Sequence, residues 1–116
     1  MMIEYKEFVL KSGKRDIAVI IHEKNGETLS SFLYSDVSAF EMEIKKGINE
    51  VLSGLNTEYS MSGNATRLEI KGETAKVYDL FAEDEAEYIG TCFTISAREL
   101  KNIVDEWCER LKEFNK

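Results

Sequence analysis

Residues 95–114 read ISARELKNIVDEWCERLKEF, and this run carries the clearest structural signal in the chain. Its apolar residues recur every three or four positions, as they do on the buried face of an α-helix. These residues are Leu100, Ile103, Val104, Trp107, Leu111 and Phe114. The spacing predicts an amphipathic helix over Ala97–Phe114 that packs against a core.

The start of this helix is marked by residues 96–99, Ser-Ala-Arg-Glu, which have the order of a capping box. In this motif the serine hydroxyl accepts from the third helical N–H, and the glutamate reaches back to the serine N–H. Residues 38–41, Ser-Ala-Phe-Glu, repeat that order before a second run of helical apolar spacing. The sequence therefore predicts another amphipathic helix over residues 38–53, with Gly54 as its stop.

The rest of the chain has the composition of strands and turns. The Asn25-Gly26 pair predicts a tight hairpin, because both central positions of such a turn need positive φ. We expect strands over residues 3–10, 17–21, 29–34, 57–61, 66–71, 75–81 and 87–95. The predicted fold is a single α+β domain over residues 1–116, in which an antiparallel β-sheet of about seven strands, order βββα-ββββα, packs with two amphipathic helices.

Length and composition place the chain among globular proteins. It has 116 residues, of which 43% are hydrophobic and 32% charged, which is enough to form one core. No segment has the roughly 20 apolar residues of a membrane-spanning helix, and no secretory signal opens the chain. Cys92 and Cys108 are too few and too far apart for a disulfide framework or a zinc site. We therefore expect reduced thiols and a cytoplasmic protein.

The chain is strongly acidic, and its charged residues are unevenly distributed along the sequence. Fifteen lysines and arginines against 22 aspartates and glutamates give a formal net charge of −7. Such a charge opposes binding to nucleic acid or an anionic membrane, and favours a basic protein partner. Between Lys76 and Arg98 there is no basic residue, and five of the seven excess negative charges lie there.

The acidic stretch is the candidate binding site. It is predicted to form a turn between two strands with an aromatic residue on either side, and tyrosine is enriched at the energetic centres of interfaces. A turn that only keeps the protein soluble is the alternative, and the spacing does not match a calcium-binding loop. The predicted partner-binding residues are Asp79, Glu83, Asp84, Glu85 and Glu87, with Tyr78 and Tyr88.

No sequence motif indicates catalysis. His22 is the only histidine, and neither Cys92 nor Cys108 lies in a recognisable nucleophilic motif, so a structural or surface role is the main interpretation for all three. The turn at residues 62–64 has neither order of a phosphate-binding loop. We expect no catalytic residue, no metal and no cofactor.

In size, acidity, predicted α+β fold and acidic turn, the chain resembles the small acidic immunity proteins of bacterial contact-dependent inhibition and other polymorphic toxin systems. The resemblance implies a non-catalytic protein that binds and neutralises a basic, nuclease-type toxin, and it carries over no individual residue.

Two alternative functions stay open. One is a nucleic-acid-binding module, because strands closed twice by a helix are similar to the Whirly and PUR-type layout, although a basic groove is missing. The other is a small enzyme or ligand-binding domain with a pocket between sheet and helices.

Overall fold

The computed structural model describes residues 1–81 and 92–116. Along the chain, its elements are β1 (Met2–Val9), β2 (Arg15–His22), α1 (Gly26–Ser31), the π-helix η1 (Phe32–Val37), α2 (Ser38–Leu52), β3 (Glu58–Ser62), β4 (Thr66–Lys71), β5 (Thr74–Asp79), β6 (Phe93–Ser96) and α4 (Ala97–Phe114).

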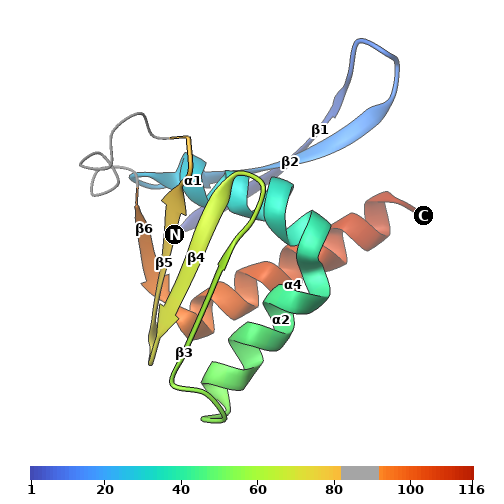
Figure 1. The fold of residues 1–116 in the computed structure, drawn as a ribbon. Coiled ribbons are helices and arrows are strands. Elements are labelled where there is room, and N and C mark those ends of the chain that lie inside the picture. Colours follow the sequence, from blue (N-terminus) through green and yellow to red (C-terminus); the bar gives the residue numbers. More distant parts are fainter. Residues whose placement is uncertain (82–91) are drawn as a thin grey trace.

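The strands form two separate antiparallel sheets. One is the β1–β2 hairpin, and the other has four strands in the order β3-β4-β5-β6. The helices lie between the hairpin and the four-stranded sheet (Figure 1). The α+β class with two long helices is therefore confirmed. The expected single sheet of about seven strands is wrong, because the described residues form six strands in two sheets.

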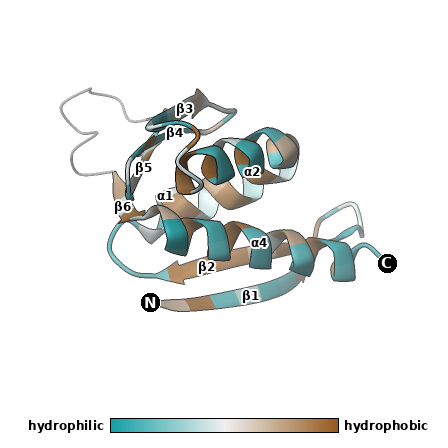
Figure 2. Ribbon diagram, turned by 90° about the horizontal axis from the view of Figure 1, so that it is seen from below, coloured by the Kyte–Doolittle hydropathy of each residue, from teal (hydrophilic) through white to brown (hydrophobic). Residues whose placement is uncertain are grey.

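One cluster of buried side chains joins these layers. The hairpin contributes Ile17, Val19 and Ile21, which alternate along β2 and point toward the helices. Figure 2 shows β2 as mainly hydrophobic, and hydrophilic residues along the outward side of α4. Trp107 of α4 is fully buried in this cluster, and its ring stacks on Tyr5 of β1 at 6.3 Å between centroids.

The strand predicted over residues 29–34 is wrong, because this segment is helical in α1 and η1. Leu29, Phe32, Leu33 and Val37 recur at spacings of three and four, and at most 1% of each is exposed. The helical period therefore places all four in the core, which an alternating strand would not do. Strands are still followed by helices twice in the residues described, but the two halves are unequal, with two strands before the first helices and four before α4.

The Asn25-Gly26 pair starts a helix instead of closing a hairpin. Asn25 has φ 61°, in the left-handed region, and it precedes α1. Gly26 is buried with its Cα against the Ile21 carbonyl, so a side chain at this position would collide with the backbone of β2. The positive φ predicted for this pair is thus present at Asn25, but it turns the chain from β2 into a helix.

Only one of the two predicted helix caps is confirmed. Ser96 has extended backbone angles, and its Oγ accepts from the N–H of Glu99 at 3.1 Å, so it caps α4. Ser38 is no cap, because Val37 and Ser38 both have helical backbone angles where η1 meets α2, and the kink in α2 lies at Phe40. Its hydroxyl instead donates to the Leu33 carbonyl at 3.1 Å and accepts from Trp107 Nε1 at 3.2 Å.

Candidate functional site

The described part of the predicted site lies at the end of β5. Asp79 Oδ1 accepts from the N–H of Phe81 at 2.8 Å, and the N–H of Leu80 donates to the Ala65 carbonyl at 3.0 Å. These bonds hold the chain as it leaves the sheet. Asp79 is half-buried, whereas Phe81 is 74% exposed.

Tyr78 lies on the outer face of the four-stranded sheet, where it pairs in register with Arg67 of β4. Burial, and then a hydrogen bond with the carboxylate of Glu69, raise the pKa of this tyrosine. Arg67, Glu69, Tyr78 and Leu80 line a shallow groove on this face. The register of the β4–β5 hairpin brings Arg67 and Glu69 to Tyr78. The sequence analysis placed both strands but did not pair their residues, so it missed Arg67 and Glu69.

Five predicted binding residues lie outside the described residues. They are Glu83, Asp84, Glu85, Glu87 and Tyr88. Residues 82–91 contain four of the 22 acidic residues and none of the 15 basic residues, so they hold four of the seven excess negative charges. On the C-terminal side of this segment, the Cys92 carbonyl accepts from Asn25 Nδ2 at 3.1 Å.

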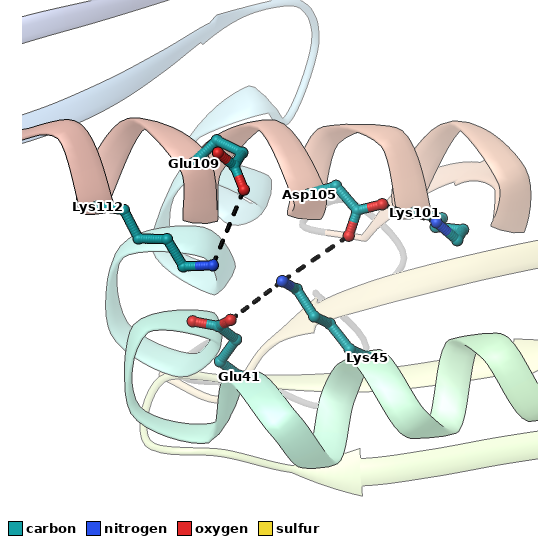
Figure 3. Close-up of polar contacts among 6 residues, drawn as sticks. All are labelled: Glu41, Lys45, Lys101, Asp105, Glu109 and Lys112. Atoms are coloured by element: carbon teal, nitrogen blue, oxygen red, sulfur yellow. Dashed lines mark hydrogen bonds and ion pairs between the residues drawn. The ribbon is translucent and has the colours of Figure 1, made fainter.

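The acidic residues between α2 and α4 already have partners of opposite charge. Figure 3 shows Glu41, Lys45, Lys101, Asp105, Glu109 and Lys112. Lys45 Nζ lies 3.0 Å from Glu41 and 4.0 Å from Asp105, and Lys101 lies 2.7 Å from Asp105. The hydrogen bond from Lys45 lowers the pKa of Glu41. These carboxylates are neutralised within the chain, so they attract a basic partner less than an unpaired cluster does.

Two side chains that were considered for catalysis lie in different parts of the fold, His22 on the surface and Cys108 in the core. His22 Nε2 lies 2.6 Å from Glu4 Oε1 on the surface of the hairpin. Cys108 is buried, and burial raises the pKa of its thiol to about 11, which disfavours the nucleophilic thiolate.

Over residues 1–81 and 92–116, no group of three or more His, Cys, Asp or Glu side chains is placed to hold a metal ion. Within the same ranges, no helix has the length and apolar character needed to cross a membrane.

One residue of the site, Phe81, could have been proposed from its position in the sequence. Phe81 immediately precedes the acidic segment, and a large exposed aromatic residue beside a charge cluster is typical of a contact surface. The sequence analysis placed it in a strand and did not include it among the binding residues.

Comparison with known proteins identifies the kind of protein. No family model matches the chain, and no solved structure matches it. A curated protein of Bacillus cereus with the name "Immunity protein" is 33% identical over 116 residues, which are 100% of this chain and 94% of the relative. This agreement confirms the resemblance to immunity proteins predicted from size, acidity and fold. The chain belongs to the same family as that immunity protein.

Proposed function

We propose that this chain is a non-catalytic inhibitor that binds a cognate toxin, a basic protein of the nuclease type, and neutralises it in the cytoplasm. The observation that carries the proposal is the 33% identity, over the whole of this chain, with a protein that has the name "Immunity protein". The net charge of −7 supports a basic partner, because a nuclease is cationic where it binds phosphate. The free thiols of Cys92 and Cys108 suit a reducing compartment.

The binding surface in this proposal is the end of β5 with the acidic segment that follows it. Glu83, Asp84, Glu85 and Glu87 supply the charge, with Asp79 beside them. Tyr78, Phe81 and Tyr88 supply aromatic contact area. The internal ion pairs of α2 and α4 support this choice, because the carboxylates there already have lysine partners, whereas residues 82–91 contain no basic residue.

Charge reversal in the acidic segment tests this surface. The variant Glu83→Lys, Asp84→Lys, Glu85→Lys should associate with the toxin about 10- to 100-fold more slowly at low salt, because electrostatic steering is lost. The difference should shrink as salt screens the charges. Stopped-flow or surface-plasmon measurements of the association rate over a salt series check this expectation. For this test, the toxin is the toxic domain that we expect the neighbouring upstream reading frame to encode.

A matched control separates a local effect from the loss of net charge. The variant Glu23→Lys, Glu43→Lys, Glu113→Lys makes the same charge change at three exposed residues elsewhere. It should associate faster than the segment variant and still restore growth when it is co-expressed with the toxin. If both variants slow association equally, the acidic segment has no special role. If the wild-type chain does not restore growth, the proposed function itself is wrong.

A further inference from the structure

The strand β1 has an open edge along its whole length. Within residues 1–81 and 92–116, which the structure describes, it pairs only with β2, in a sheet of two strands. None of its eight residues is buried, although three residues of β2 are. Figure 2 shows β1 at the rim of the molecule. An open edge presents unpaired backbone N–H and C=O groups that another strand can bind.

This edge also exposes apolar side chains. Met2 is 64% exposed and Phe8 38% exposed. The side chains of a strand alternate between its faces, and Tyr5 faces α4 because it stacks on Trp107. Met2, Glu4, Lys6 and Phe8 therefore share the opposite, outward face. A hairpin of two strands is marginally stable in water, and added strands on the same sheet stabilise it.

The outward face of β1 is complementary to itself when the strand is turned around. In an antiparallel pair of two β1 strands centred on Tyr5, Met2 lies opposite Phe8 of the second copy, and Glu4 lies opposite Lys6 of the second copy. The two-fold axis repeats both contacts. Apolar pairs and pairs of opposite charge directly across a sheet are both stabilising. We propose that β1 binds β1 of a second copy of this chain in this register, forming a continuous four-stranded sheet from two hairpins.

The neighbouring registers are unfavourable. A shift of two positions in one direction places Glu4 opposite Glu4 of the second copy, and a shift in the other direction places Lys6 opposite Lys6. Like charges directly across a sheet are destabilising. A shift of one position places outward side chains against inward ones, so it mismatches the two faces. The sequence of β1 thus selects the register centred on Tyr5.

The existing contacts of β1 are compatible with this pairing. On the inward face, Glu7 forms an ion pair with Arg15 of its own hairpin, and the Arg110 guanidinium lies over the Tyr5 ring, 4.5 Å from its centroid. On the outward face, Glu4 contacts His22 through Oε1. Its other carboxylate oxygen is the one that would contact Lys6 of the second copy.

The test is the oligomeric state of the full chain without any toxin. Sedimentation velocity over a dilution series from about 10 µM to about 1 mM, the range for a weak association, should show a mass that approaches twice the 13.3 kDa of one chain. Lys6→Glu should weaken the dimer by about tenfold or more, because each of the two symmetric ion pairs becomes a repulsion. The double variant Glu4→Lys, Lys6→Glu should restore the dimer, since the charges are exchanged but remain complementary.

The controls address charge, folding and the identity of the partner. Lys76→Glu makes the same charge change at an exposed residue of β5 and should leave the dimer unchanged. Circular dichroism should show that all variants are folded. A wild-type chain that stays monomeric at the highest concentration overturns the proposal. So does a double variant that is as monomeric as Lys6→Glu. If the chain is monomeric and Lys6→Glu weakens toxin binding instead, the edge belongs to the toxin.

Discussion

Asp36 is a buried carboxylate, with 1% of its surface exposed, near the C-terminal end of η1. Its two oxygens accept from the backbone N–H groups of Asn64, Ala65 and Thr66, and from the Thr66 hydroxyl. Gly63 completes the site, because a Cβ there would collide with the Asp36 side chain. One side chain thus ties the π-helix to the turn between β3 and β4.

From these contacts we expect the removal of the Asp36 carboxylate to lower the stability of the fold strongly. Asp36→Ala should lower the free energy of unfolding by about 3–5 kcal/mol, because buried N–H groups of the turn lose their acceptor. Urea denaturation followed by circular dichroism measures this loss. The control Glu43→Ala removes an exposed carboxylate and should change stability by less than about 0.5 kcal/mol. A loss below about 1 kcal/mol for Asp36→Ala would show that the turn does not depend on this carboxylate.

At the scale of single elements, two serines with the same sequence context have different roles. Ser96 starts α4 as a cap, whereas Ser38 has helical backbone angles where η1 meets α2 and accepts from the indole of Trp107. The difference arises because η1 supplies the carbonyl groups that precede α2, so that the first N–H groups of α2 do not need a side-chain acceptor.

A double-mutant cycle distinguishes these two roles. Ser96→Ala should cost about 1 kcal/mol of unfolding free energy, with or without Trp107→Phe. Ser38→Ala should cost about 1–3 kcal/mol in the wild type and clearly less in the Trp107→Phe background, because phenylalanine has no N–H that needs an acceptor. Both costs come from urea denaturation. Equal costs of Ser38→Ala in the two backgrounds would contradict the assigned hydrogen bond.

For the molecule as a whole, the buried cluster predicts one cooperative unit. Trp107, the single tryptophan, lies against Tyr5 of β1 and Tyr34 of η1, and it donates to Ser38 of α2. Its fluorescence therefore reports on the contact between the hairpin and the helices. Far-UV circular dichroism reports on all elements together.

We expect the two signals to unfold with the same midpoint in urea, as in a two-state transition. Ile17→Ala on β2 should cost about 2–5 kcal/mol and lower both midpoints together, because Ile17 is 5% exposed within the common cluster. A fluorescence midpoint that falls while the circular dichroism midpoint stays would show that the hairpin unfolds separately. The single domain predicted from the sequence would then be wrong.

The sequence by itself determined the elements whose signals are local. The helix over Ala97–Phe114 and its serine cap follow from the spacing of apolar residues and one four-residue motif. The strand over Thr66–Lys71 matches its predicted bounds, because turns with glycine flank it. Size, acidity, the predicted α+β fold and the acidic turn together indicated a resemblance to immunity proteins. For Leu29 to Val37, the helical spacing was present in the sequence, but the preceding Asn-Gly pair favoured a hairpin instead.

Only the tertiary structure decided which partners those elements find. Two sheets replace one because the helices between β2 and β3 separate the hairpin from the other four strands, and no hairpin turn joins the two sets. Where elements so far apart in sequence lie relative to one another is set by packing in the core. The same reason applies to Ser38 and Trp107, which are 69 positions apart, and to Asp36 and Thr66, which are 30 apart. At the site, the β4–β5 hairpin places Tyr78 beside Glu69, and the fold leaves Phe81 exposed. Local sequence sets the form of a segment, and burial of side chains in a shared core sets its neighbours.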